Sequence, residues 1–155
     1  MKDNKLIFAH ISDDDPIKEL IKQGFDMSLD VSGGWGYTQQ NPLVLHSSDI
    51  PKKQLQHTLA TMRTHLEMSL TQKYENRYGG INLNELSREY HLQGDKKYEK
   101  VTYSATAMKE EDYTKFINEY KNGYGKEDFD MQAHFEARKI ATVTLKIEMW
   151  FLDQD

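Results

Sequence analysis

An alternation of apolar residues near the C-terminal end of the sequence restricts the fold more than any other feature. Nearly every odd position is apolar from Phe129 to Ala137, and again from Ala141 to Phe151. A period of two residues is typical of a β-strand with one buried face. One strand over the whole stretch would be roughly 75 Å long, which is too long for a domain of 155 residues. The pattern therefore predicts two extended segments, separated by a bulge, bend or turn near Arg138-Lys139-Ile140.

Further extended segments are expected where branched and aromatic residues cluster or alternate with polar ones. Glycine, proline and asparagine near their ends are typical of turns. The expected strands are Leu6–Ile11, Phe25–Val31, Leu43–Leu45, Leu86–Gln93 and Tyr98–Met108. Asn76 to Gly80 is expected to form a loop.

Three helices are expected, at about residues 15–23, 50–72 and 110–122. The longest carries Leu55, Leu59, Met62, Leu66 and Leu70 along one face, at the spacing of an amphipathic helix. Acidic residues or serines before a proline predict the starts of the first two helices, by capping and by favourable charge at the helix N-terminus. Asp13, Asp14 and Asp15 could instead form a cation site, but three consecutive carboxylates do not all point inward.

These elements predict an α+β protein with a single domain over residues 1–155. A mainly antiparallel sheet is expected to pack against the long amphipathic helix and the two shorter helices. No repeat, low-complexity tract or Pro/Gly-rich linker divides the sequence.

Composition excludes several classes of function. The net charge of −5 is spread along the chain, so no basic stripe is present to bind a nucleic acid. The absence of cysteine removes disulfides, thiolate zinc sites and a cysteine nucleophile, and fits a reducing cytoplasm. The apolar run near residue 6 is too short for the core of a signal peptide or for a membrane span. We therefore expect a cytoplasmic protein that binds neither nucleic acid nor membrane.

The segment SGGWGYTQQNP, residues 32–42, has the glycine content of a phosphate-binding loop. A Walker loop would need a Lys-Ser/Thr pair after its last glycine, and a dinucleotide fingerprint would need to run into a helix. Here Gly36 is followed by Tyr37-Thr38-Gln39, and the next segment is expected to be extended. The segment is therefore predicted to connect two strands.

Two interpretations of this connection remain. In one, its glycines form a turn and Trp35 or Tyr37 folds over the core. In the other, the loop is a ligand-binding platform, because flat aromatic faces beside amides suit sugars, bases or peptide backbones. The candidate ligand-binding residues are Trp35, Tyr37, Gln39, Gln40 and Asn41, with His57 or His65 of the long helix beneath them.

Metal and cofactor chemistry is not expected. His57 and His65 are eight residues apart, so they are displaced by about 80° around a helix. A helical zinc pair needs a spacing of four residues. No serine nucleophile elbow is present. Acid–base partners need only meet in space, so the sequence leaves open whether the protein is an enzyme.

Both faces of the last expected strand become apolar at its end, where Met149 to Leu152 are consecutive apolar residues. Trp150 and Leu152 are therefore either covered by the protein's own helices or in contact with a second subunit. The first hypothesis is a non-enzymatic protein-binding or regulatory module, with a protein partner or a second copy as ligand. The alternative is a binder or enzyme for a sugar-like or nucleotide-like molecule, with its pocket at residues 33–41.

Overall fold

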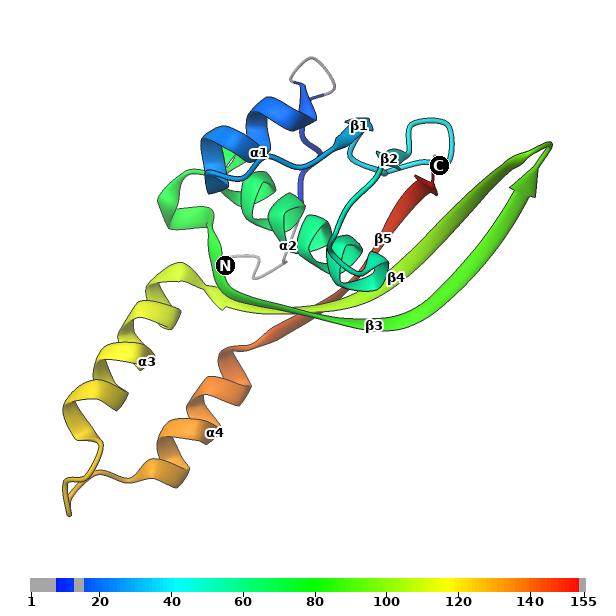
Figure 1. Cartoon of the computed structure of the whole chain (residues 1–155). Helices are drawn as coiled ribbons and strands as arrows, with labels where there is room; N and C mark the ends of the chain where they lie inside the picture. The colour runs from blue at the N-terminus through cyan, green and yellow to red at the C-terminus, as the bar shows by residue number, and fades with distance from the viewer. Residues whose placement is uncertain (1–7, 13–15, 154–155) are drawn as a thin grey trace.

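The computed structural model describes residues 8–12 and 16–153, and places all its strands in one sheet (Figure 1). The helices are α1 (Ile17–Phe25), α2 (Lys52–Thr71), α3 (Glu110–Gly123) and α4 (Met131–Ala141), with a 3-10 turn at Tyr74–Asn76. The strands are β1 (Val31–Gly33), β2 (Leu43–Leu45), β3 (Tyr78–Gln93), β4 (Lys96–Lys109) and β5 (Val143–Asp153). The expected α+β class is confirmed. No helix of the described ranges is long and apolar enough to cross a bilayer.

The sheet has the order β1-β2-β5-β4-β3, so the C-terminal strand lies at its centre. β5 pairs antiparallel with β4, from Tyr98–Leu152 to Ala107–Val143, and parallel with the short β2. The other pairs are antiparallel. The expectation of a mainly antiparallel sheet is therefore met, with one parallel pair that the pattern did not indicate.

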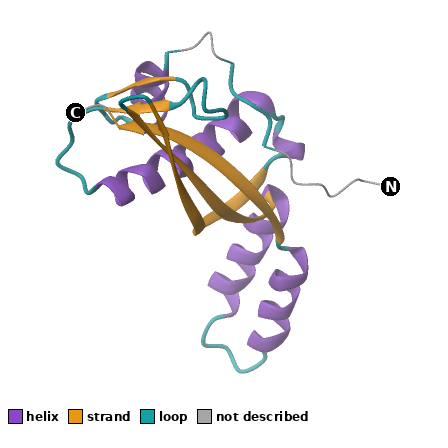
Figure 2. Cartoon of the chain, turned by 90° about the vertical axis from the view of Figure 1, so that its right-hand side faces the viewer, coloured by secondary structure: helices purple, strands orange, loops and turns teal. Residues whose placement is uncertain are grey.

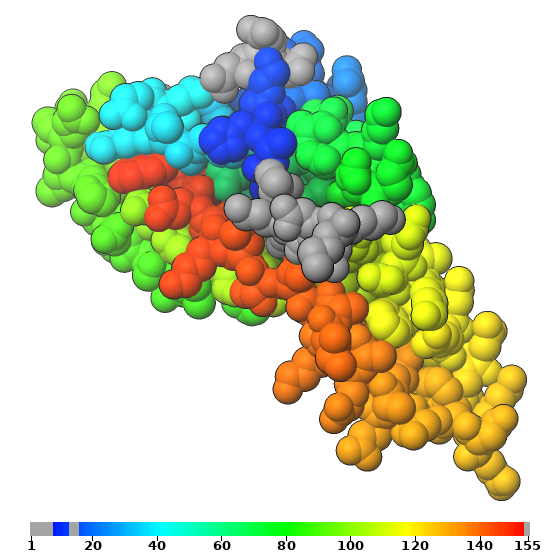
Figure 3. All heavy atoms as spheres, turned by 180° about the vertical axis from the view of Figure 1, so that it is seen from behind, coloured from blue at the N-terminus to red at the C-terminus, as the bar shows by residue number. Residues whose placement is uncertain are grey.

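The core lies between the sheet and α2, the long helix expected at residues 50–72. Val101, Tyr103, Ala105 and Ala107 of β4 alternate toward this core, and Leu55, Leu59 and Leu66 of α2 face them. Leu70, which the periodicity placed on the same face, is exposed because the last turn of the helix passes beyond the packed region. On the opposite face, side chains of β5 reach the surface beside those of the β3–β4 hairpin (Figure 3).

The segment at 129–137 is the main error of the sequence interpretation, because α4 replaces the expected strand. Met131, Gln132, Ala133, Glu136 and Arg138 are of types with moderate or high helix propensity, and Asp130 caps the first turn by accepting a bond from the Ala133 amide at 3.0 Å. The alternating apolar positions do not mark a buried face here, since Met131 and Phe135 are exposed. The chain becomes a strand only at Val143, where β-branched residues return.

In the N-terminal half, the ends of several elements also differ from the predicted ones. The predicted strand Phe25–Val31 is wrong over most of its length. Phe25 is the last residue of α1, and Asp26 terminates that helix in a left-handed conformation. Residues 26–30 alternate in burial but pair with no strand, and β1 is only Val31–Gly33. Residues 8–11 form no strand, and Leu6 and Ile7 lie outside the described residues. The acidic triplet 13–15 also lies outside them. At α2, Pro51 occupies the cap position and no side chain caps the helix.

α3 and α4 form a helical hairpin that projects from one end of the sheet (Figure 2). It connects the end of β4 directly to the start of β5. β3 begins at Tyr78, inside the stretch 76–80 that was expected to be a loop. This early start brings the first residues of β3 beside the hairpin's base.

Candidate functional site

The glycine-rich connection at residues 33–42 packs closely against the central strand, β5. Gly33 and Gly36 have φ of +79° and +78°, which L side chains rarely adopt. The Gly36 carbonyl accepts a hydrogen bond from the Trp150 amide at 2.7 Å. A Cβ on Gly36 would lie 2.5 Å from the Trp150 carbonyl oxygen. The glycines therefore permit backbone-to-backbone contact with β5, and the predicted strand-to-strand connection between β1 and β2 is confirmed.

Trp35 faces the core. Its side chain is 1% exposed, and its backbone carbonyl accepts a hydrogen bond from Arg63 Nη1 at 3.1 Å. The indole is therefore not available as the roof of an open pocket, and the turn interpretation describes this residue.

Tyr37 is held by the buried end of α2. Its hydroxyl donates to Glu67 Oε2 and accepts from the Ile11 amide, each at 3.0 Å, and its ring stacks on His10 at 3.8 Å. Burial and the neighbouring Glu67 carboxylate raise the pKa of the Tyr37 hydroxyl above its ordinary range. The ring's faces and its hydroxyl are thus occupied by the protein itself.

Glu67 and Arg63 form a buried charged pair on α2, with 3.8 Å between Glu67 Oε1 and Arg63 Nε. Burial raises the pKa of Glu67 to about 7, against the opposing effects of Arg63 and of the Tyr37 hydrogen bond. Burial likewise lowers the pKa of Arg63. The Arg63 guanidinium also donates to the carbonyls of Trp35 and Glu148, so it connects α2 to the loop at 33–42 and to β5. Its contacts describe a structural role.

The other predicted site residues are dispersed. Gln40 is exposed, Gln39 is half-buried, and Asn41 closes the turn through its backbone, since its carbonyl accepts from the Gly36 amide at 3.2 Å. His57 lies 3.0 Å, through Nε2, from the Leu83 carbonyl on β3. The structure therefore does not bring His57 beneath the loop at 33–41.

The two predicted interface residues differ in exposure. Leu152 is buried, whereas Trp150 is half-buried, with its ring centroid 5.1 Å from that of His91 and 5.8 Å from Lys100 Nζ. Trp150 belongs to the sheet face opposite α2, and its neighbours on that face come from β3 and β4. The protein's own chain thus covers Leu152 and part of Trp150.

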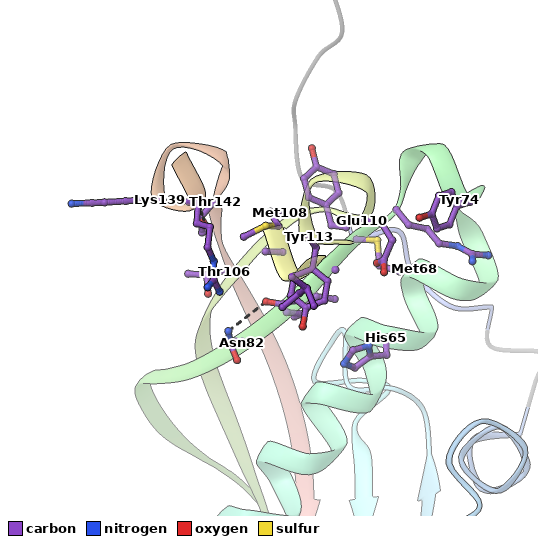
Figure 4. A pocket seen from close by; sticks show the side chains of 18 of the residues that line it. His65, Met68, Tyr74, Asn82, Thr106, Met108, Glu110, Tyr113, Lys139 and Thr142 are labelled. Carbon is purple, nitrogen blue, oxygen red and sulfur yellow. Dashed lines mark hydrogen bonds between the residues drawn. The ribbon is translucent and has the colours of Figure 1, made fainter. Parts of the chain in front are cut away.

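A cavity of about 880 Å³ lies elsewhere, where the end of α2, the start of β3 and the bases of α3 and α4 meet. Figure 4 shows Asn82, Thr106 and Thr142 on one side, Tyr74 on the opposite side and His65 below, with Glu110 and Tyr113 between them. Of the sequence-predicted candidates, His65 lines this cavity, whereas the residues of the loop at 33–41 do not.

Gly79 and Gly80 allow α3 to approach β3 at the centre of the cavity. A Cβ on Gly79 would lie 2.3 Å from the Glu110 carboxylate, and one on Gly80 would lie 2.7 Å from the Tyr113 ring. Gly80 also has a φ of +58°, and the register with β4 shifts between Gly79 and Asn82, which marks a bulge. The two glycines thus seat the first turn of α3 against the sheet and fix Glu110 and Tyr113 in the lining.

Cationic side chains outnumber anionic ones around this cavity. Arg77, Arg138 and Lys139 line it with the titratable His65, against the single carboxylate of Glu110. The Arg77 guanidinium is anchored by donating to the carbonyls of Gln72 and Ser69 at 2.9 and 3.1 Å. Arg138 lies over the Phe135 ring at 5.5 Å, and within the described ranges neither Arg138 nor Lys139 forms an ion pair.

The remainder of the lining combines apolar surface with hydroxyl and amide groups. The apolar part comes from side chains of five helices and strands, α2, β3, β4, α3 and α4: Met68, Ile81, Met108, Ile117 and Phe135. Polar atoms come from Tyr74, Tyr113, Asn82, Thr106 and Thr142. Such a lining, apolar with a few placed polar groups, is typical of small-molecule sites.

Sequence reasoning missed every cationic residue of this cavity. Arg138 and Lys139 were interpreted as a break in a strand, and Arg77 as part of a loop. The Gly79-Gly80 pair was the available signal, because paired glycines at the start of a strand indicate a bulge or close approach of another element. Nothing in the sequence indicated that α4 would line the same cavity as that bulge.

A second polar cluster, far from this cavity, surrounds Glu99 on β4. Lys52 and Arg88 form ion pairs with its carboxylate, and Gln56 donates to it at 3.1 Å. Burial opposes the ionisation of Glu99, but these partners hold its pKa below its ordinary value. The cluster fixes the N-terminal half of α2 to β3 and β4 near their shared hairpin.

Comparisons of the chain with models of protein families, with curated proteins and with solved structures find no match.

Proposed function

We propose that this protein binds a small anionic molecule in the cavity between α2, β3, α3 and α4. The observation that carries the proposal is the charge of the lining: an acidic chain, with a net charge of −5, places three permanent cations and one carboxylate around its cavity. Cations without carboxylate partners beside a concave surface attract anions.

The arrangement of the cations favours a carboxylate or phosphate group near the base of α4. Arg138 has no ion-pair partner among the described residues, and Arg77 is fixed on the other side of the cavity by its backbone contacts. A guanidinium binds carboxylate and phosphate oxygens with paired hydrogen bonds, so it both attracts and orients the anion. Lys139 lies at the rim, and its side chain extends away from the other labelled residues, so its charge would act only at long range (Figure 4).

The rest of the lining suits a ligand with a flat or apolar body. Phe135 and Tyr113 offer aromatic surface, and Met68 and Met108 can adapt to an irregular shape. Binding is thus proposed at a site other than the loop at 33–41, where Trp35 is buried and Tyr37 is engaged by Glu67.

The experiment is a fluorescence titration with 8-anilinonaphthalene-1-sulfonate, a probe that joins one anionic group to an aromatic body. We expect saturable binding to the unchanged protein. The Arg138→Glu variant should bind about ten to a hundred times more weakly, because a hydrogen bond to a charged group contributes about 1.5–3 kcal/mol.

The matched control is Lys146→Glu, which makes the same change of charge at an exposed position of β5 that does not line the cavity. It should leave the affinity within about twofold, as is usual for a screened surface charge. Equal loss of affinity in both variants, or unchanged binding in Arg138→Glu, would contradict the proposal.

The non-enzymatic character, the protein partner and the cytoplasmic location are further parts of our proposal. They rest on the missing catalytic motifs, the absence of cysteine and the apolar residues around Trp150. A thermal-shift comparison of phosphorylated and carboxylated metabolites would extend the probe titration to natural ligands, with Arg138→Glu as the reference for binding at this cavity.

A further inference from the structure

The distal half of β3 is an unprotected sheet edge. β3 is the last strand in the sheet order, and its register with β4 is unbroken from Ser87 to Gln93. The β3–β4 hairpin runs past the N-terminal end of α2 (Figure 1). That helix contacts one face of the strand, through the hydrogen bond from Arg88 to Gln56, and no described helix covers its outer edge. Edges of this kind are usually shielded by short strands, prolines or lysines, and β3 has 16 residues and neither of those types.

The turn at the end of the hairpin determines which backbone groups face outward. Gly94 and Asp95 form a two-residue connection, with Gln93 opposite Lys96. The pair that flanks such a connection exchanges its backbone hydrogen bonds, and the bonding direction alternates along an antiparallel strand. The amide and carbonyl groups of Leu92, Tyr90 and Arg88 are therefore directed away from β4.

Exposed apolar side chains accompany these outward-directed backbone groups. Leu92 is 78% exposed and Tyr90 is 55% exposed, and Lys97 Nζ lies 4.8 Å from the centroid of the Tyr90 ring. Arg88, in contrast, is fixed by Glu85, Gln56 and Glu99. The edge thus combines a rigid backbone with apolar surface that the described chain leaves in solvent.

We infer that this edge pairs with the same edge of a second copy of the chain, antiparallel and with its two-fold axis at Tyr90. This register places Tyr90 opposite Tyr90 and Arg88 opposite Leu92, so all the outward backbone groups of residues 88–92 find partners. The sheets of the two copies then join into one continuous sheet.

Cross-strand pairing favours this register over the one with its axis at Glu89. With the axis at Tyr90, Glu89 of each copy lies opposite His91 of the other, which is a favourable cross-strand pair. An axis at Glu89 would place two carboxylates opposite one another, which is unfavourable. Lys100 and Trp150 lie beside these residues on the same sheet face, with Lys100 Nζ 3.6 Å from Glu89 Oε2 and the Trp150 ring 5.1 Å from that of His91.

The inferred pairing agrees with the predicted homodimer but places its contacts at the edge of β3 instead of at Trp150 and Leu152. Trp150 is beneath the paired edge rather than in it, and Leu152 is buried by its own chain. The observations are independent of the cavity at α3 and α4, which lies toward the opposite end of β3. Loss of anion binding would therefore leave this inference standing, and loss of the dimer would leave the cavity proposal standing.

Light scattering and sedimentation of the full chain test the dimer. We expect a dimer whose population rises with concentration, and a loss of at least tenfold in dimer affinity in Tyr90→Lys or Leu92→Lys. The matched control is Ile140→Lys, because Ile140 is an equally exposed apolar residue on α4; it should leave the dimer unchanged. A monomer at every concentration, or a dimer insensitive to Tyr90→Lys, overturns the inference. Circular dichroism confirms that each variant is folded.

Single cysteines test the register, since the chain has none of its own. Residues opposite one another in a hydrogen-bonded antiparallel pair are about 5.5 Å apart between Cα atoms, within the range of a disulfide. Under mild oxidation, Tyr90→Cys should form covalent dimers rapidly and quantitatively, whereas His91→Cys and Leu86→Cys should form at least tenfold fewer. Preferential cross-linking of His91→Cys or Leu86→Cys overturns the register.

Discussion

The Glu67 carboxyl group is buried against Arg63 and Tyr37, with 1% of the residue exposed. Its hydrogen bond from Tyr37 and its attraction to Arg63 favour the charged form, but burial has the larger effect and raises its pKa to about 7. The native protein therefore holds a proton on Glu67 at a pH where an unfolded chain has released it.

A dependence of stability on pH follows from this carboxyl group. Between its ordinary pKa of 4.5 and about 7, the native state binds the proton and the unfolded state does not, so this group's contribution to the free energy of unfolding falls as the pH rises. We measure the free energy of unfolding by urea denaturation at pH 5 and at pH 8. Between these values we expect it to fall by on the order of 2–3 kcal/mol more in the unchanged protein than in Glu67→Gln.

The control for this measurement is Glu136→Gln, which changes an exposed glutamate on α4 in the same way. Its curve should run parallel to that of the unchanged protein. Parallel curves for Glu67→Gln and the unchanged protein would show that the burial of Glu67 does not govern its ionisation.

At the level of single residues, sequence reasoning recovered the conformation of the glycine loop but not the direction of its side chains. Failure of the phosphate-loop templates was enough to predict a strand-to-strand connection, because backbone chemistry is local. Whether Trp35 faces inward depends on Arg63 and on β5, which lie far away in sequence. His65 was named as a candidate for the loop at 33–41 but lines the other cavity, because a helix face alone does not indicate which neighbour it meets.

Among the secondary-structure elements, α4 is the one whose sequence was misinterpreted. Asp130 accepts from the Ala133 amide and so satisfies one of the unpaired donors in the helix's first turn. The helix buries only His134 deeply, between Phe116, Tyr120 and Phe129. A helix with so narrow a buried stripe depends on local interactions more than a core helix does.

Removal of this cap should therefore weaken α4 measurably. We expect Asp130→Ala to reduce stability by about 1 kcal/mol and to speed hydrogen exchange at the amides of the first turn of α4. Asp128→Ala, two residues earlier and outside the helix, is the control and should leave both quantities unchanged. Equal exchange rates in the two variants would contradict a capping role.

The stretch 129–151 has one alternating pattern but contains both α4 and most of β5, so periodicity alone could not distinguish the helix from the strand. Alternation predicted the second half correctly, because Val143, Ile147 and Met149 face a helix across the sheet. In the first half, the same spacing occurred by coincidence in residues that favour helix. A rule that weighed the cap at Asp130 and the absence of β-branched residues would have separated the two halves.

In the whole molecule, the helical hairpin is inserted between two strands that lie side by side. β4 enters it and β5 leaves it, and these strands pair with each other from Tyr98–Leu152 to Ala107–Val143. The candidate cavity lies at the base of this insertion, where α2, β3, β4, α3 and α4 all contribute to its lining. Sequence reasoning could not place it, because no segment carries more than part of the lining.

Cleavage at the tip of the hairpin should leave the molecule assembled. We expect the recognition sequence of a specific protease, inserted between the exposed Gly125 and Lys126, to be tolerated and to be cut rapidly. The two fragments should elute together under native conditions, because the β4–β5 pairing and the core on α2 span the cut. They should separate only in denaturant. Separate elution without denaturant would mean that the hairpin itself holds the two halves together.

The parallel pairing of β2 with β5 has a consequence for the order of folding. Leu43 lies opposite Phe151, so this contact closes a loop of about a hundred residues, whereas the β3–β4 hairpin closes through two. Loop-closure entropy makes distant contacts slow to form. The β3–β4 hairpin is therefore expected to form early, and β1 and β2 can join the sheet only after β5 has formed. During synthesis on the ribosome, the chain would carry α2 and an incomplete sheet until β5 emerges, a window in which a chaperone could recognise the uncovered core.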